Sequence, residues 1–185
     1  WRDIDKVIGN YLSRKDIAVV GVNCLSYFWT KRTPGEVGRD LGWLVGHYLK
    51  QWNMNHVVLI GFSFGADILP PAYNRLPVDL QKKVVMITLL SPTRSTEYEF
   101  HISGWLSSGS SGTADLLEPE IMKIEKNKLQ CFYGAEDSDE TLCTLPCVKD
   151  TEIIRTSGGH HFDGNYEALG DRILSGLSVK KKKNN

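Results

Sequence analysis

The chain has 185 residues, of which 41% are hydrophobic and 24% are charged, so it is long enough to bury a core as one globular domain. Its 22 basic and 22 acidic residues balance, which argues against nucleic acid as the main partner. No apolar run reaches the roughly 18 residues of a membrane helix. The sequence starts at Trp1 with no signal peptide, and we expect any targeting signal to lie upstream of it.

The first third of the chain predicts two helices separated by a strand. Apolar residues in 4–12 keep helical spacing, and 17–22, with the sequence IAVVGV, form a short apolar run typical of a strand. From Thr33, the sequence TPGE offers an N-cap, a first-turn proline and a capping-box glutamate. A helix is therefore expected to begin there and to continue to about Trp52.

Short apolar runs bounded by Gly, Pro or polar residues predict further strands, and helix-compatible segments lie between them. This alternation is typical of βαβ units, so we expect an α/β fold with a mostly parallel sheet and helices on both faces. The expected strands are 57–60, 84–90, 129–133 and 152–156.

Two segments do not follow this alternation of strands and helices. Residues 91–118 are long and rich in Ser and Gly but carry several aromatic and aliphatic residues, so they are either a lid or binding loop or a surface excursion. The terminal run 179–185 is rich in lysine and is expected to be a disordered tail. The expected organisation is a single domain over 1–178.

The four cysteines leave their pairing open. Cys143 and Cys147 bracket a short loop and are either a local disulfide or two free thiols, whereas Cys24 and Cys131 lie at expected strand ends and suit a core. The chain lacks the paired Cys and His spacing of a metal site. We therefore expect neither a metal nor another cofactor.

The sequence HVVLIGFSFGAD, from His56 to Asp67, carries the main functional signal. A buried strand runs into a Gly-x-Ser-x-Gly turn that is followed by a helix-compatible stretch, 66–75. In a nucleophile elbow of this kind, the tight turn presents the serine hydroxyl above the sheet edge. The simpler alternative is a strand-to-helix turn built from small residues. We interpret Ser63 as a candidate nucleophile.

A serine nucleophile needs a base, and the base needs a carboxylate to orient it. Asp137 follows an expected strand and is the preferred acid, with Glu136 and Asp139 as alternatives. His160 and His161 lie on a Gly-rich loop after the last strand, and we prefer His161 as the base, with His160 as the alternative. The order Ser, acid, His matches α/β-hydrolases.

Four separated stretches together resemble the bacterial virulence protein family VirJ/AcvB, an α/β-hydrolase branch, over nearly the whole chain. They are YFWTKRTP, GFSFGADILPPAYNRLP, YGAEDSDETLC and GGHHFDGNY. The resemblance implies a periplasmic protein linked to type IV secretion and virulence. It also implies a hydrolase of aminoacylated phosphatidylglycerol, such as lysyl-phosphatidylglycerol, with Ser63 as nucleophile, Asp137 as acid and the His160–His161 pair as base.

In the family, a strand and a glycine-rich loop come just before the position of Trp1, and that loop supplies one oxyanion-hole amide. The N-terminal strand and the oxyanion loop are therefore expected to be missing from this chain, which would lower or abolish its own activity. The second amide is that of Phe64.

Carried to the substrate, the resemblance requires an acidic group for the lysine ammoniums and an apolar surface for the lipid. An alternative function is a non-catalytic periplasmic binding or chaperone-like factor for type IV secretion substrates, which would use the fold only as a scaffold. The candidate substrate-binding residues are Tyr27, Phe28, Trp29, Asp67, Asp139 and Asp163, with Glu97 and Glu99 as further acidic candidates.

Overall fold

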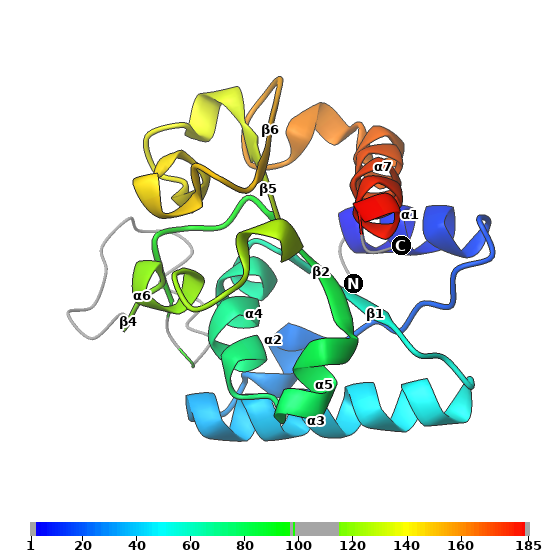
Figure 1. Cartoon of the computed structure of the whole chain (residues 1–185). Coiled ribbons are helices and arrows are strands. Elements are labelled where there is room, and N and C mark those ends of the chain that lie inside the picture. Colours follow the sequence, from blue (N-terminus) through cyan, green and yellow to red (C-terminus); the bar gives the residue numbers. More distant parts are fainter. Residues whose placement is uncertain (1–2, 97, 99–114, 184–185) are drawn as a thin grey trace.

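The computed structural model describes residues 3–96, 98 and 115–183. Its main sheet has four parallel strands in the order β1-β2-β5-β6 (Figure 1). The α/β prediction is confirmed, because each strand is joined to the next through helical segments. The strands are β1 (Val57–Phe62), β2 (Val84–Leu90), β5 (Leu129–Gly134) and β6 (Glu152–Thr156).

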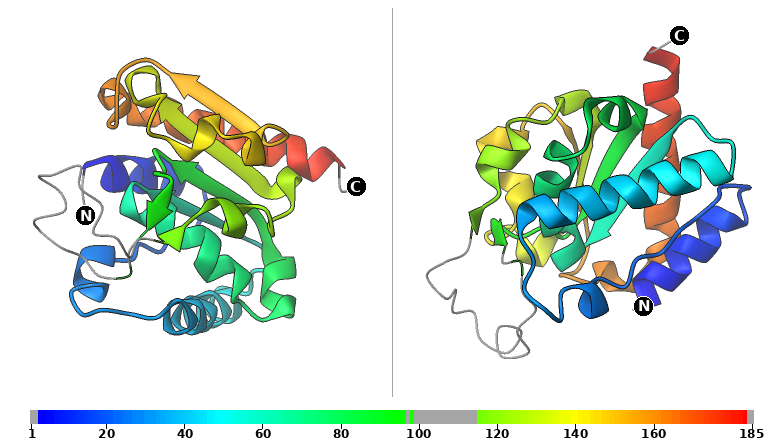
Figure 2. Two further views of the ribbon diagram at one scale, coloured as in Figure 1. Left: turned by 90° about the vertical axis from the view of Figure 1, so that its left-hand side faces the viewer. Right: turned by 90° about the horizontal axis from the view of Figure 1, so that it is seen from below.

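Helices cover both faces of this sheet, as predicted (Figure 2). Helices α3 (Pro34–Gln51), α4 (Phe64–Asn74) and α5 (Val78–Lys83) pack on one face, and α1 (Asp3–Ser13) and α7 (Tyr166–Lys183) pack on the other. Tyr11 of α1 and Arg14, the residue after α1, bond to Asp171 and Glu167 of α7, which joins the first and last helices of the described chain.

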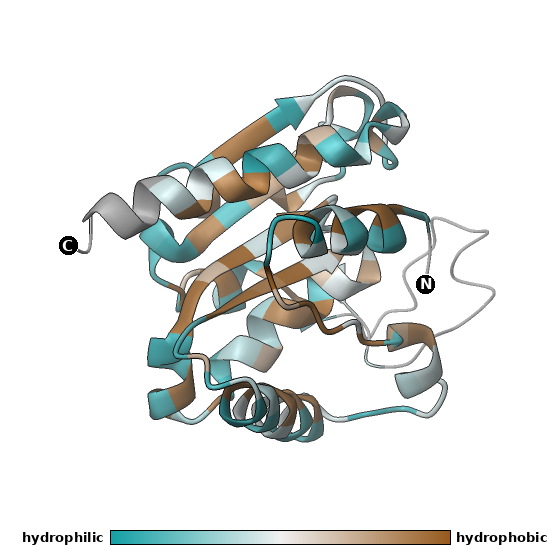
Figure 3. Cartoon of the chain, turned by 90° about the vertical axis from the view of Figure 1, so that its right-hand side faces the viewer, coloured by the Kyte–Doolittle hydropathy of each residue, from teal (hydrophilic) through white to brown (hydrophobic). Residues whose placement is uncertain are grey.

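The core is divided by the sheet into two apolar layers. In β2, Ile87 and Leu89 join the layer under α3 and α4, whereas Met86 and Leu90 join the layer under α1 and α7. Strand β2 is buried on both faces, and the strands of the sheet carry apolar stretches, brown in Figure 3, between the covering helices. A strand buried on both faces is a continuous apolar run, which is why these strands were visible in the sequence.

Helix α3 begins as its sequence predicts. Thr33 caps it, with the backbone N–H of Glu36 donating to the Thr33 hydroxyl at 3.2 Å and the Thr33 N–H donating to the Glu36 carboxylate at 2.8 Å. This reciprocal capping box satisfies two amides that would otherwise lack acceptors. It fixes the point at which the chain enters the helix that leads to β1.

The predicted strand at 17–22 is wrong. Residues 17–23 form no regular element, although Ile17 and Val19 pack on the apolar layer beside Val58 and Ile60. The apolar pattern drives burial, but a strand also needs a neighbour for its backbone hydrogen bonds. Within the described residues, β1 is an edge of the sheet and this segment does not pair with it.

Several short elements complete the described chain. Within the long segment 91–118, β3 and β4 pair antiparallel, and residues 97 and 99–114 lie outside the described residues, so the lid interpretation stays a prediction. The short helices and strands are α2 (Cys24–Tyr27), β3 (Ser95–Thr96), β4 (Asp115–Leu116) and α6 (Glu118–Ile121), with 3₁₀ turns at Lys126–Lys128, Ala135–Asp137, Leu142–Thr144, Pro146–Val148 and Phe162–Gly164.

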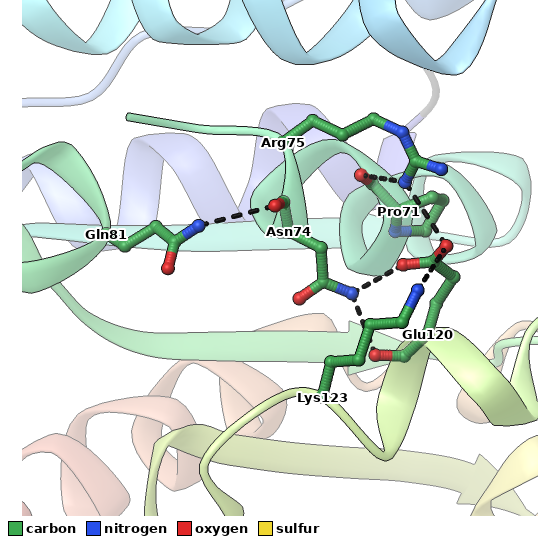
Figure 4. A network of polar contacts seen from close by, with 6 residues as sticks. All are labelled: Pro71, Asn74, Arg75, Gln81, Glu120 and Lys123. Atoms are coloured by element: carbon green, nitrogen blue, oxygen red, sulfur yellow. Dashed lines mark hydrogen bonds and ion pairs between the residues drawn. The ribbon is translucent and has the colours of Figure 1, made fainter. Parts of the chain in front are cut away.

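A polar network holds α6 against the end of α4 (Figure 4). The Asn74 amide donates to the Glu120 carboxylate at 2.6 Å and to the Glu120 carbonyl at 2.9 Å, and Arg75 and Lys123 both pair with the same carboxylate. These bonds fix the described end of the long 91–118 segment to α4, the helix that directly follows Ser63.

The chain end and the cysteines differ from expectation. Residues 179–183, expected in the disordered tail, continue α7, since lysine is a good helix former and favours a helix C-terminus. The suggested Cys143–Cys147 disulfide is wrong: Cys131 pairs with Cys143, and Cys24 and Cys147 are free thiols. Spacing along the chain could not show that Cys143 folds back onto β5. No helix among the described residues is long and apolar enough to cross a membrane.

Candidate active site

Four loops meet at the carboxyl edge of the sheet, where parallel α/β sheets place their chemistry. Ser63 follows β1, Ser91 follows β2, Asp137 follows β5 and His160 follows β6. Because adjacent strands run parallel, all four residues lie at the same edge. The predicted order of Ser, acid and His along the chain is therefore compatible with one site.

Ser63 lies at the turn between β1 and α4 in a conformation that disfavours any side chain. Its φ is 53° and its ψ is −123°, and its carbonyl accepts the amides of Ala66 and Asp67 at the start of α4. The turn is so tight that a Cβ on Gly61 would lie 2.4 Å from the Gly65 carbonyl oxygen. These features define a strained strand-to-helix turn, which is the backbone geometry of a nucleophile elbow.

The base candidate that reaches the serine is His160. Its Nε2 lies 2.8 Å from Ser63 Oγ, which is hydrogen-bonding distance, whereas the preferred candidate was His161. His161 is exposed, and its ring packs on the Phe62 ring at a centroid distance of 5.5 Å. The preference for His161 is corrected to His160, since adjacent residues on a loop point in different directions and the backbone decides which one faces Ser63.

Among the residues that the structure describes, Asp137 forms an ion-pair contact with the base candidate. Its Oδ2 lies 3.8 Å from His160 Nδ1, is buried, and accepts no hydrogen bond from the described residues. This separation exceeds a hydrogen bond, and catalytic contacts of this kind often tighten only when substrate is bound. The two alternatives, Glu136 and Asp139, are exposed. The geometry therefore favours Asp137.

The acid and base loops are held against each other by their backbones. A Cβ on Gly134 would lie 2.3 Å from the Gly159 carbonyl oxygen, and the Glu136 amide donates to the Gly158 carbonyl at 3.0 Å. Only a glycine at 134 allows the end of β5 to approach the histidine loop this closely. This approach brings Asp137 to the histidine.

Ser91 is a residue that the sequence interpretation missed. It is buried, adopts a left-handed φ of 48°, and donates from Oγ to the His160 carbonyl at 3.2 Å. Its amide donates to the Phe132 carbonyl in β5. A polar residue directly after an expected strand was the available signal, because that position shares the edge with Ser63.

Phe64 is the first residue of α4, so its amide belongs to the helix turn whose N–H groups face the space before the helix. That position suits the predicted oxyanion role. The Phe64 ring packs edge-on against Phe28, which is 2% exposed. Phe28 therefore supports the elbow from the core and is not an open substrate contact.

The two neighbouring aromatic candidates have different surroundings. Tyr27 donates its hydroxyl to Asp40 Oδ2 at 2.6 Å, and burial together with that hydrogen bond raises the pKa of Tyr27 to about 12. Trp29 is 67% exposed. Of the three aromatic candidates, Trp29 is the one whose side chain is open to solvent.

The acidic candidates are also separated by the structure. Asp139 and Asp163 are exposed, and Asp67 is buried with an exposed fraction of 5%. The Asp67 carboxylate meets the Thr93 amide at 2.7 Å and the Thr93 hydroxyl at 3.0 Å. Asp67 therefore fixes the loop after β2 to α4 and is not placed to receive a substrate ammonium. Glu97 and Glu99 lie outside the described residues.

Burial of Asp67 favours its protonated form over its ionised form. The Thr93 hydroxyl has one hydrogen, and the Ser95 carbonyl lies 2.7 Å from it. The hydroxyl can donate that hydrogen to the Asp67 carboxylate or to the Ser95 carbonyl, and in the second case a protonated Asp67 can donate to the Thr93 oxygen. Burial likewise raises the pKa of Asp67 to about 7, against the opposing effect of the Thr93 hydrogen bonds.

We expect Asp67→Asn to remove a pH dependence of stability. When the pKa of an Asp is higher in the folded state than in the unfolded state, its protonation stabilises the fold fully at a pH below the unfolded-state pKa, near 4. This contribution is lost as the pH rises to the folded-state pKa of about 7. Asparagine keeps the neutral geometry. Between pH 5 and pH 8, the free energy of unfolding of the wild type should therefore fall by about 2 kcal/mol more than that of Asp67→Asn.

Denaturant titrations at the two pH values test this expectation. Asp79→Asn is the matched control, because Asp79 also lies in the first turn of a helix but is exposed. An identical pH dependence in the wild type and in Asp67→Asn would contradict the raised pKa of Asp67.

Among the residues that the structure describes, no group of three His, Cys, Asp or Glu side chains could hold a metal ion. At this edge of the sheet, a hydroxyl, an imidazole and a carboxylate lie one after another at the start of a helix.

Comparison with known proteins adds one finding. No curated protein and no solved structure gives a significant match to the chain. The family model described as bacterial virulence protein (VirJ) matches residues 1–181, which is nearly the whole sequence. The chain therefore belongs to the VirJ family of bacterial virulence proteins.

Proposed function

We propose that this protein is a serine hydrolase that cleaves carboxylic esters. The observation that carries the proposal is the 2.8 Å contact between His160 Nε2 and Ser63 Oγ, made at a strained elbow that presents the hydroxyl at the sheet edge. A serine hydroxyl is a weak nucleophile until a base accepts its proton. His160 is at the required distance to do so.

The first half of the reaction forms an acyl-enzyme. Ser63 Oγ attacks the ester carbonyl carbon while its proton passes to His160 Nε2, and the Asp137 carboxylate stabilises the imidazolium through Nδ1. The negative carbonyl oxygen is placed at the Phe64 amide. When the tetrahedral intermediate collapses, the alcohol leaves with the proton from His160.

The second half reverses these roles with water. His160 accepts a proton from a water molecule, whose oxygen attacks the acyl carbon, and Ser63 leaves with the proton returned by the imidazole. Overall, one ester and one water molecule are consumed, and one free acid and one alcohol are formed. One Asp137–His160 contact has to shorten from 3.8 Å for both halves to proceed well.

The family resemblance supports a narrower substrate and a periplasmic location. In lysyl-phosphatidylglycerol, the ester joins the lysine carboxyl group to a glycerol hydroxyl, so acyl transfer to Ser63 would release phosphatidylglycerol first and lysine second. The lysine ammoniums would need a carboxylate, and Asp139 and Asp163 are the exposed acidic candidates among the described residues. Trp29 offers an exposed aromatic surface for the lipid.

Incubation with defined lipid tests the substrate. Vesicles that contain lysyl-phosphatidylglycerol should lose it and gain phosphatidylglycerol and free lysine in equal amounts, because a serine triad attacks acyl carbon and not phosphorus. Mass spectrometry of the lipids and an amino-acid assay measure both products. Release of a phosphoglycerol would contradict the mechanism, and equal cleavage of the alanyl ester would contradict only an acidic lysine pocket.

A fluorophosphonate probe separates this proposal from a non-catalytic binding factor. The probe phosphonylates an activated serine, so the wild type should be labelled and Ser63→Ala should not. A protein that uses the fold only as a scaffold has no need of an activated hydroxyl and should remain unlabelled.

A further inference from the structure

We infer that the disulfide between Cys131 and Cys143 is a positioning element of the active site, which holds Asp137 within reach of His160. The two cysteines are 12 residues apart in the sequence, and Asp137 lies halfway between them. The disulfide thus closes a loop with the candidate acid at its middle. This inference rests on the proposed function of the site.

One end of the loop is fixed in the centre of the sheet. Cys131 lies in β5 and pairs with Leu89 of β2 on one side and with Ile153 of β6 on the other. Both cysteines are 1% exposed. A strand with partners on both sides is among the most rigid parts of a fold, so Cys131 provides a fixed anchor.

The other end of the loop connects Cys143 to Asp137 through a short series of hydrogen bonds. The Cys143 amide donates to the Thr141 hydroxyl, and the Thr141 amide donates to the Asp137 carbonyl at 3.2 Å. The Thr141 hydroxyl donates in turn to the Pro92 carbonyl, directly after Ser91. A displacement of Cys143 would therefore be transmitted to Asp137.

The loop matters for function because it sets the distance between Asp137 and His160. Asp137 Oδ2 is 3.8 Å from His160 Nδ1, and a charge-assisted hydrogen bond would require about 2.8 Å. The carboxylate has to move by about 1 Å, and a misplacement of that size can change a rate by as much as a hundredfold. A covalently closed loop limits the carboxylate to small movements. The same loop without the disulfide can carry Asp137 away from the base.

A double-mutant cycle tests the inference on the whole protein. The disulfide is removed by Cys131→Ala together with Cys143→Ala, in the wild-type background and in the Asp137→Asn background. The matched control is Cys24→Ala together with Cys147→Ala, which removes the two free thiols and keeps the disulfide. The kinetic constants kcat and KM are measured on a soluble 4-nitrophenyl ester, at a temperature at which all variants are folded.

We expect removal of the disulfide to lower kcat about tenfold with KM changed less than twofold, and to lower kcat less than twofold when Asp137 is already Asn. The control pair should retain wild-type kcat. The inference would be overturned if removal of the disulfide lowered kcat by the same factor in both backgrounds, or did not lower it at all. A purely structural effect on kcat would not depend on the Asp137 carboxylate.

A second variant guards against loss of folding. Cys143→Ser with Cys147→Ala also prevents the disulfide but leaves the Cys131 thiol to fill its place in the core, and the same cycle is expected with it. A wild type that neither hydrolyses the ester nor reacts with the fluorophosphonate removes the proposed function together with this inference. An active wild type with additive losses removes this inference alone.

Discussion

In the full-length protein, Ser63→Ala is expected to lower ester hydrolysis by about 10⁵-fold or more and to leave the free energy of unfolding nearly unchanged. The Ser63 hydroxyl lies 2.8 Å from His160 Nε2 and is the proposed site of the acyl intermediate, so alanine removes the reacting oxygen. Alanine has the same backbone preferences as serine at the observed φ of 53°, so the strain of the turn is retained.

The measurement compares kcat/KM and denaturant unfolding for three proteins: the wild type, Ser63→Ala and Ser178→Ala. Ser178 lies on the exposed side of α7, where its hydroxyl bonds only within the helix, so the control loses a hydroxyl without touching the site. Turnover near the wild-type level in Ser63→Ala would remove Ser63 as the nucleophile.

Replacing His160 and His161 singly by alanine should produce very unequal losses. His160→Ala removes the base that contacts Ser63, and we expect kcat to fall by at least about 10⁴-fold. His161→Ala removes a ring that packs on Phe62 at the surface, and we expect less than a tenfold change. The adjacent histidines are each other's control, since both are surface-accessible imidazoles on one loop.

Kinetics on the soluble ester and the rate of fluorophosphonate labelling report the two variants independently of any lipid. Mild losses of similar size would argue against a His160–Ser63 pair. A large loss at His161 alone would restore the expectation drawn from the sequence and would require a different conformation of the loop.

Much of the fold could be predicted because the signals are local. The β-branched runs of β1, β2 and β6, the capping box at Thr33 and the glycines around Ser63 each specify their own conformation. The segment 17–22 shows the limit of this approach. Its apolar pattern predicts burial correctly, yet a strand depends on a partner that a pattern does not reveal.

The site was predictable in its order along the chain and less so in its detail. Ser63 and Asp137 follow strands that the sequence marks, so their meeting at one edge follows from a parallel sheet. The choice of His160 over His161 depends on the path of a glycine-rich loop pressed against Gly134, which is a tertiary constraint. The burial of Asp67 and the partner of Cys143 are tertiary facts of the same kind.

The backbone of Ser63 has a consequence for any attempt to engineer this protein. Glycine would adopt its φ of 53° and ψ of −123° without steric cost, whereas serine gives up roughly 1–3 kcal/mol of stability there. A redesign guided by thermal tolerance alone would therefore replace the very residue proposed to react. At this position, a gain in stability would remove the proposed nucleophile. A more stable variant that keeps Ser63 therefore has to gain its stability elsewhere in the fold.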